Sequence, residues 1–577
     1  ASWSCARKII TMWMSELPPF VPFFLAALLV LVTRGTLQSA ILLAAPLLGG
    51  LHLWFDVGPD ILVTYQLLEY ELVLMRTDQL SLVFGYIFHI AALVLVIYTL
   101  HLKDTVQHVS GLIYAGSAMG ATFAGDLITL FIFWELLAVS SVFLVWANRD
   151  NASIRAGFRY LIYQVLSGVI LLAGALIHYR YTGSLAFDFI GLENPGGWLI
   201  LIAFGIKCAF PFLHTWLTDA YPASTPTGAA VLSVFTTKVA VYALARGYPG
   251  TEILIYIGAV MTCFPIFYAV IENDLRKVLS YSLINQLGFM VVGIGIGSAL
   301  ALNGAVSHAF SHILYKSLLF MSMGAVLYRV GNIYASDLGG LYKSMPKTTV
   351  LCIIGAASIS AVPLFSGFIS KSLVMTALLG EGQYIVWLML LFASAGVLHH
   401  AGIKVPFFAF FAHDSGIRTT EAPMNMLIAM AIAAVLCVAI GVWPEYLYAM
   451  LPWQMDYWPY DVSHVLAQLQ LLFFAALAFV WMEIKHYAPP ELHATNLDAE
   501  WSYRKLLPAT GRYVYRTTRQ LGDSIGNVVG VPMQSVHRAL LRSPLMDRYL
   551  TGNWPTGGMV FWIAVILGGF VLLDNMS

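Results

Sequence analysis

The sequence has 577 residues, of which 59% are hydrophobic and 10% are charged, and its mean hydropathy is +0.78. This composition excludes an ordinary soluble globular protein and indicates a chain with many membrane-spanning helices. Lysine plus arginine and aspartate plus glutamate each number 30, so the net charge gives no reason to expect a nucleic acid as partner.

A membrane-spanning helix needs about 20 mostly apolar residues, and about sixteen such runs follow one another along the chain. The run 348–379 is long and contains Pro363, which predicts a broken helix. Between the second and third runs, the alternating stretch DILVTYQLLEYELVLM predicts an extramembrane hairpin of short strands. The predicted spans are 18–33, 36–55, 79–101, 108–124, 126–147, 157–179, 197–218, 227–246, 251–271, 276–297, 303–328, 348–379, 385–411, 424–445, 462–483 and 557–574.

Basic residues predict the orientation, because lysine and arginine accumulate in cytoplasmic loops. The connections after odd-numbered spans hold most of them, among them Lys103, Arg276 and Lys343. We therefore place the odd connections in the cytoplasm. The basic segment 484–556 fits this scheme as an amphipathic helix on the membrane surface or against a neighbouring subunit.

Three titratable side chains occur at intervals of four residues in the span 303–328: His308, His312 and Lys316. At 100° per residue they lie within an arc of about 80° and rise about 12 Å, which makes a polar ladder on one helix face. Lys316 is roughly 18 Å from either end of its span, so its amine cannot reach the membrane surface. A single buried histidine most often joins helices through a hydrogen bond, but three titratable groups on one face favour proton transfer.

Other charged residues lie inside predicted spans, where each costs about 2.5–3.5 kcal/mol unless it faces the bundle interior or a water path. Structural ion pairs are the alternative interpretation, but such pairs rarely need several lysines without an evident partner. Together with the ladder, these residues predict a chain of proton-exchanging sites. They are Glu135, Lys207, Lys238, Lys371 and Lys404.

A weak internal repeat supports this interpretation. An offset of 152 residues aligns 158–179 with 310–331 and places Gln164 opposite Lys316. Spans four to eight and nine to thirteen would then form two repeats, inverted because five spans reverse the direction of the chain. Breaks near Pro211 and Pro363 would occupy equivalent places and mark ion sites. Two pairs of buried lysines have similar separations, 164 residues for Lys207 and Lys371 and 166 residues for Lys238 and Lys404.

The stretches 210–244, 274–295 and 308–321 resemble the antiporter-like subunits shared by respiratory complex I, membrane-bound hydrogenases and Mrp-type cation/proton antiporters. The resemblance covers roughly residues 80–445, and the stretch 395–418 is most similar to the D-type subunit of the Mrp antiporters. It implies an all-α polytopic membrane protein with about 14 core helices, two inverted five-helix repeats and broken helices 7 and 12. This chain adds a C-terminal extension with about two more spans.

The resemblance also implies a proton relay along a central hydrophilic axis. Movement of the fifth-helix glutamate towards or away from the seventh-helix lysine is expected to switch the proton affinity of that lysine. The expected relay residues are Glu135, Lys207, Lys238, His308, His312, Lys316, Lys371 and Lys404. Of these residues, Lys404 is the one whose role is least strongly implied by the family resemblance.

We divide the chain into six predicted segments. They are the N-terminal helices with an extracytoplasmic hairpin (1–107), the first repeat (108–250), the second repeat (251–411), helix 14 with the following span (412–483), the cytoplasmic basic amphipathic segment (484–556) and a C-terminal transmembrane helix (557–577).

The expected function is that of a proton-translocating subunit of a multisubunit Na⁺ (or other monovalent cation)/H⁺ antiporter, a secondary transporter and not an enzyme. Its expected partners are other membrane subunits, including a second antiporter-like subunit, in the lipid bilayer of a bacterial plasma (inner) membrane. No cofactor or metal is expected, because the five cysteines show no metal-ligand spacing and no glycine-rich phosphate loop occurs.

Three alternatives remain open at this point. The chain would be a proton-pumping module of a redox-driven complex, an energy-coupling subunit of another uptake system, or a scaffold that transports nothing. Partners that carry redox cofactors would favour the proton-pumping module. Activity that does not depend on Na⁺ would favour the energy-coupling subunit, and full activity after loss of Lys207 or Lys238 would favour the scaffold.

Overall fold

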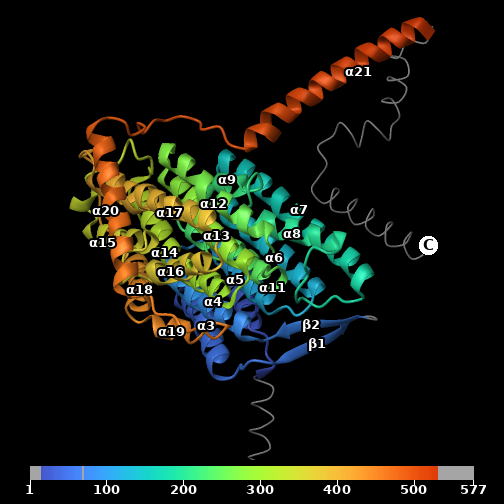
Figure 1. Ribbon diagram of the computed structural model, residues 1–577, viewed down its shortest axis with the longest axis horizontal. Helices are drawn as coiled ribbons and strands as arrows, with labels where there is room; N and C mark the ends of the chain where they lie inside the picture. The colour runs from blue at the N-terminus through green and yellow to red at the C-terminus, as the bar shows by residue number, and fades with distance from the viewer. Residues whose placement is uncertain (1–14, 68–69, 530–577) are drawn as a thin grey trace, which may run out of the picture. The chain divides into compact units, whose positions relative to one another are not determined.

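The computed structural model describes residues 15–67 and 70–529, which divide after Asn496 into two compact units (Figure 1). The first unit is a bundle of helices with one small hairpin, and the second contains helix α21 (Leu507–Val529). The predicted C-terminal span 557–574 lies outside the described residues. The chain is an all-α polytopic membrane protein, and eleven described helices are long and apolar enough to cross a membrane.

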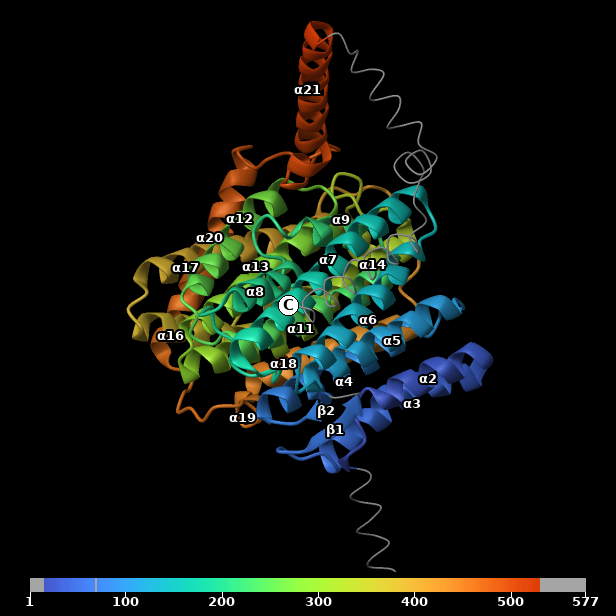
Figure 2. The same ribbon diagram turned by 90° about the vertical axis from the view of Figure 1, so that its right-hand side faces the viewer.

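The helices of the first unit follow the predicted spans closely, as expected when apolar run length dictates each helix. α2 and α3 lie side by side at one edge of the unit (Figure 2). The unbroken helices are α2 (Val21–Val32), α3 (Gly35–Phe55), α4 (Gln79–Thr99), α5 (Thr105–Phe123), α6 (Leu127–Trp146), α7 (Asn151–Thr182), α12 (Ile253–Ile271), α13 (Leu275–Ile296), α14 (Ala299–Val330), α18 (Met424–Val442), the short α19 (Pro444–Tyr448) and α20 (Val462–Ile484).

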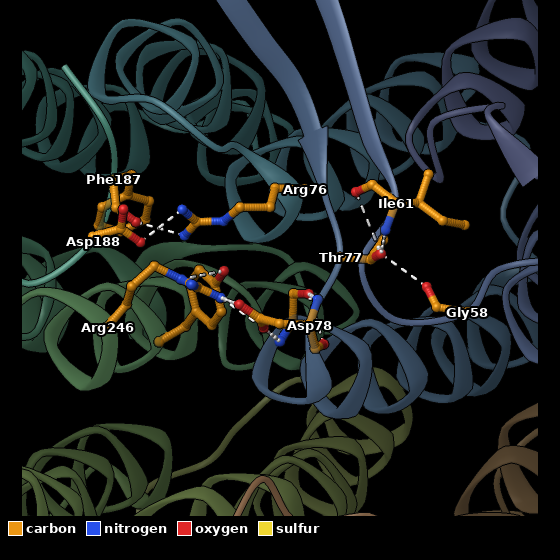
Figure 3. Close-up of polar contacts among 10 residues, drawn as sticks. Gly58, Ile61, Arg76, Thr77, Asp78, Phe187, Asp188 and Arg246 are labelled. Atoms are coloured by element: carbon orange, nitrogen blue, oxygen red, sulfur yellow. Dashed lines mark hydrogen bonds and ion pairs between the residues drawn. The ribbon is translucent and has the colours of Figure 1, made fainter. Parts of the chain in front are cut away.

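The predicted hairpin is confirmed. Strands β1 (Leu62–Leu67) and β2 (Tyr70–Arg76) pair antiparallel between α3 and α4. Two ion pairs tie the end of β2 to the first repeat, Arg76 with Asp188 at 2.7 Å and Asp78 with Arg246 at 2.6 Å (Figure 3).

Asp78 also begins helix α4. Its carboxylate accepts a hydrogen bond from the backbone N–H of Ser81 at 2.8 Å, which forms a capping box. Burial acts to raise the pKa of this carboxyl, but Arg246 and the Ser81 N–H outweigh burial and hold the pKa below its usual range.

Two helix pairs establish the internal repeat. The bounds of α5 and α12, and those of α7 and α14, are 148 residues apart at both ends. The predicted offset of 152 residues is therefore wrong by one helical turn for these helices. With the corrected offset, Gln164 is equivalent to His312, and Gly168 is equivalent to Lys316.

The predicted breaks in the seventh and twelfth spans are confirmed. The seventh comprises α8 (Pro195–Lys207) and α9 (Thr215–Ala223), and the twelfth comprises α15 (Pro346–Ile359) and α16 (Ser366–Gly380). Four non-glycine residues with positive φ beside the two prolines keep both breaks in the same strained backbone form. They are Ala209 (60°) and Phe212 (68°) in the first repeat and Ala361 (58°) and Leu364 (74°) in the second.

Two spans expected to be regular are not. The eighth span is divided into α10 (Gly228–Leu232) and α11 (Thr236–Gly247). The thirteenth continues from α17 (Tyr384–Val397) into π-helical turns at Leu398–Lys404 and Phe407–Phe411. Period alone did not reveal these irregularities because each span, despite its buried lysine, is long and mostly apolar, as a regular helix would be. Irregular turns of this kind often occur at functional sites in helices.

The described part of the predicted segment 484–556 includes α21 in the second unit. Leu507, Val514 and Leu521 recur every seven residues in this helix, while Arg512 and Arg516 lie on its other face. α21 is therefore an amphipathic helix, as the sequence predicted.

Candidate functional site

All eight predicted relay residues lie in the first unit, seven of them buried and Glu135 half-buried. They are contributed by α6, α8, α11, α14, α16 and the π-helical turn after α17. In the most apolar 18-residue stretch of α13, and in that of α14, 94% of the residues are buried inside the protein. In the corresponding stretch formed by α10 and α11 together, all residues are buried. The ladder and Lys238 therefore lie in the centre of the bundle.

Glu135 and Lys207 are neighbours, as predicted, but they do not form an ion pair. The Lys207 amine donates to the carbonyl of Trp134 at 2.5 Å and lies 4.6 Å from the centroid of the Trp134 ring. Oε1 of Glu135 has no hydrogen-bond partner among the described residues. Among the described residues, each is nonetheless the charged group that acts on the other. The two charges are close enough to interact, although no ion pair closes between them.

Gly168 of α7 makes room for the Glu135 carboxylate. A Cβ atom at this glycine would lie 1.4 Å from Oε1 of Glu135, so any larger residue would displace the carboxylate. Because Gly168 is equivalent to Lys316, the two repeats use the same helix position differently. The first repeat admits a carboxylate there, and the second repeat provides an amine.

Three buried lysines bind the carbonyl ends of helices. These carbonyls have no partner within their helix and carry the negative end of the helix dipole, so they stabilise an ammonium in an apolar interior. The pairs are Lys238 with Ser233 after α10 (2.5 Å), Lys371 with Ile359 at the end of α15 (2.9 Å), and Lys404 with Val270 (2.6 Å) and Glu272 (2.8 Å) at the end of α12. The helix breaks thus supply ligands for the relay amines.

The ladder on α14 links the two repeats. Nδ1 of His308 lies 2.9 Å from the hydroxyl of Ser370, the residue before Lys371. His312 and Lys316 have no hydrogen-bond partner among the described side chains and backbone groups. Both lie within electrostatic range of Lys238 and Lys371. The ladder therefore lies within electrostatic range of titratable groups in both repeats.

The structure adds two groups that the predicted relay omitted. His400, one turn before Lys404, is buried, has no hydrogen-bond partner among the described residues, and interacts electrostatically with Lys316 and Lys404. Glu491 pairs with Lys404 at 2.8 Å. His400 was visible in the sequence beside Lys404, but no motif or spacing distinguished Glu491.

A cavity of about 340 Å³ reaches Lys371 from the side of α20. The α20 wall of this cavity lies near the beginning of that helix. The polar residues in the wall are Lys371, Ser372 and Thr376 of α16, Ser394 of α17, and His464, Gln468 and Gln470 of α20.

The chemistry of these groups is proton binding and release. Amines, imidazoles and one carboxylate follow one another through both repeats, each in a poorly solvated position where a small change in surroundings alters proton affinity. Within residues 15–67 and 70–529, no cluster of three or more histidine, cysteine or carboxylate side chains is arranged to hold a metal ion.

Comparison with known proteins supports the resemblance noted in the sequence. Residues 124–398 match the protein family described as "NADH:quinone oxidoreductase/Mrp antiporter, TM". The chain is 28% identical over 498 residues to the A-type Na⁺/H⁺ antiporter subunit of Alkalihalophilus pseudofirmus, an alignment that covers 77% of this chain and 59% of the relative. It is 31% identical over 288 residues to the D-type Na⁺/H⁺ antiporter subunit of the same organism, covering 46% of this chain and 58% of the relative.

A solved structure shares the fold. A chain of the Mrp complex from Dietzia sp. DQ12-45-1b superposes with a TM-score of 0.74 at 21% identity, covering 97% of this chain and 62% of that chain. The chain thus spans about 60% of the length of the relatives it matches. Because the A-type and D-type subunits both match, similarity does not distinguish between these two subunit types.

Proposed function

We propose that the chain is a proton-translocating subunit of a multisubunit Na⁺ (or other monovalent cation)/H⁺ antiporter, because its residues 124–398 match the family described as "NADH:quinone oxidoreductase/Mrp antiporter, TM". Its partners are other membrane subunits, including a second antiporter-like subunit, in a bacterial inner membrane. The protein is a secondary transporter subunit in this proposal.

One observation carries the proposal. The buried titratable groups continue from Glu135 through Lys207, Lys238 and the α14 ladder to Lys371, across both repeats. A purely structural role would favour closed ion pairs, since an unpaired buried charge is costly. Here only Lys404 has an ion-pair partner, and the other amines are held by carbonyls or have no partner among the described residues.

Glu135 is the proposed switch. With an effective dielectric of about 20, a charge pair is worth about 4 kcal/mol at 4 Å and about 2 kcal/mol at 8 Å. Movement of the carboxylate towards Lys207 therefore favours the ammonium, and movement away favours transfer of the proton to Lys238. Repulsion between neighbouring protonated groups then couples each titration along the row to the next.

The decisive experiment measures proton flux in inside-out vesicles that contain the assembled complex, from a host without its own antiporters. Addition of Na⁺ should collapse an imposed pH gradient with native protein. Lys238→Ala should abolish this response while the subunits still copurify, because no other amine occupies its place at the centre of the bundle. Lys103→Ala, which removes a lysine from an exposed loop, is the matched control and should behave as native.

A second candidate follows from the family description, which includes NADH:quinone oxidoreductases. In that case the same relay pumps protons for a redox-driven complex. Acidification driven by a redox substrate and indifferent to Na⁺ would establish this candidate and overturn the antiporter proposal. Full Na⁺-dependent flux in Lys238→Ala would instead disprove the relay itself.

A further inference from the structure

The linker 485–496 after α20 reaches back over the bundle and contributes a carboxylate to a relay lysine. Oε1 of Glu491 lies 2.8 Å from Nζ of Lys404, whose side chain is 1% exposed. The Lys404 amine also donates to the carbonyls of Val270 and Glu272, so its three hydrogen-bond donors are all used. This lysine is therefore held in place as a cation.

Two contacts anchor the linker. One is made to the loop that follows α14, and the other is made to the end of α12. Nε2 of His493 lies 3.0 Å from Oδ1 of Asp337, and its ring packs edge-on against Tyr334. Asn496 donates to Oε2 of Glu272 at 3.2 Å. Hydrogen bonds from Asn332, Ser336 and His493 lower the pKa of Asp337 to about 2, so this anchor stays ionised at neutral pH.

The Glu491 carboxyl is slightly exposed to solvent, and one of its two oxygens accepts no hydrogen bond from the described residues. Its side chain is 10% exposed, and its second oxygen, Oε2, is buried without a hydrogen-bond partner among the described residues. Burial raises the pKa of Glu491 above its usual range even though the Lys404 ammonium acts in the opposite direction. Burial therefore favours the protonated form of this carboxyl more than in a solvent-exposed glutamate.

Lys404 also has a titratable neighbour on its own span. His400 lies one turn earlier and interacts electrostatically with both Lys404 and Lys316. In the predicted orientation, Glu272, Asp337 and Glu491 all lie on connections after odd-numbered spans, at the cytoplasmic side.

We infer that Glu491 is the proton-exchanging group at the cytoplasmic end of a branch that runs through Lys404 and His400 to Lys316, an inference that rests on the proposed proton relay. The Lys404 ammonium gives a proton to the neutral His400 imidazole. The resulting Lys404 amine takes a proton from the Glu491 carboxylic acid, and the Glu491 carboxylate is reprotonated from bulk water. The His400 imidazolium then passes its proton to the neutral Lys316 amine, so the transfers together move one proton from bulk water to Lys316 and return Glu491, Lys404 and His400 to their starting forms.

The test uses the assembled complex in the same vesicles. Glu491→Gln keeps a hydrogen-bonding side chain of the same size but cannot exchange a proton, so Na⁺-driven flux should fall about a hundredfold, the lower end of the range for loss of a positioned acid or base. Glu491→Asp should retain flux within about twofold, and formate should partly restore flux in Glu491→Gln by supplying a small carboxylic acid. Glu381→Gln, in the exposed loop after α16, is the matched control.

Labelling of the native complex with dicyclohexylcarbodiimide gives a readout that needs no variant. This reagent modifies protonated carboxyl groups in apolar surroundings, so mass spectrometry should find it on Glu491, more slowly at high pH. The inference would be overturned if Glu491→Gln kept the flux of the unmodified complex, or if Glu491 carried no label. In either case, Na⁺-driven flux in the unmodified complex would leave the proposed function intact. Absence of Na⁺-driven flux in the native complex would instead refute the proposed function.

Discussion

The two repeats bring a carboxylate to a buried lysine in different ways. In the first repeat, Glu135 belongs to the repeat itself, lies against Gly168 and forms no ion pair with Lys207. At the end of the second repeat, Glu491 comes from the linker after α20 and forms a closed ion pair with Lys404. An open pair suits a switch whose two charges change separation, whereas a closed pair suits exchange with solvent at a fixed position.

The equivalent helix positions explain why the second repeat needs an external carboxylate. With an offset of 148 residues, the position of Glu135 corresponds to Leu283, and the position of Gly168 corresponds to Lys316. The second repeat thus has an amine where the first admits a carboxylate, and its own helices supply no counterpart of Glu135. Glu491 of the C-terminal extension supplies the carboxylate that pairs with Lys404, while Glu272 and Glu483 act on this lysine from a greater distance.

The largest difference is expected in stability. Lys404→Ala leaves the Glu491 carboxylate buried without its partner and should destabilise the protein by about 3–5 kcal/mol, the usual cost of breaking a buried ion pair. Lys207→Ala breaks no ion pair and should cost clearly less. Thermal unfolding of the purified complex in detergent, followed for both variants, measures the difference. Equal losses would show that the open and closed pairs are equivalent.

Activity should show the reverse order. Glu135→Gln removes the charged group that, among the described residues, acts on Lys207, and should lower cation-driven flux about a thousandfold, against about a hundredfold for Glu491→Gln. Glu193→Gln, in the exposed loop before α8, is the matched control. If Glu135→Gln retained most of its flux in the vesicle assay, the open pair would not be a switch.

Gly168→Ala sharpens the comparison without removing a titratable group. The added methyl group would overlap Oε1 of Glu135 and force the carboxylate away from α7, so flux should fall about tenfold if the position of that charge controls proton transfer. Gly111→Ala in α5, where a Cβ meets open space, should leave flux unchanged. Equal flux in these two variants would refute the need for the Glu135 position seen here.

The ion pair between Asp78 and Arg246 lies outside the proposed relay and shows how much a partly exposed ion pair contributes to stability. An asparagine side chain can still cap α4, so Asp78→Asn removes mainly the ion pair with Arg246 and should cost about 0.5–1 kcal/mol, allowing for partial exposure to solvent. Because the pKa of Asp78 is held below its usual range, this stabilisation is complete above about pH 4 and is lost as pH falls through the lower folded-state value. The measurement is the free energy of unfolding of the native and Asp78→Asn proteins at neutral and at acidic pH. The difference between the two proteins should shrink on acidification, and a difference that grows would contradict the prediction.

Much of the fold was predictable because the bilayer allows few solutions. Apolar run length located the spans, Pro211 and Pro363 located two breaks, and alternation located the hairpin. The break between α10 and α11 and the π-helical turn Leu398–Lys404 were not predictable, because no proline lies within either and both belong to spans whose overall composition is that of a regular membrane helix. The alignment of the repeats was displaced by one turn because helices of period 3.6 tolerate a shift of four residues.

The site shows the same division. A charge inside an apolar run is costly wherever the chain folds, so the sequence alone determined that Glu135, the α14 ladder and the buried lysines needed a polar interior. Which groups meet was decided only by tertiary structure: Lys207 reaches a carbonyl of α6, and Lys404 meets a carboxylate 87 residues further along the chain. Local sequence pattern carries no record of such contacts, because they depend on packing between helices and not on the period within one helix.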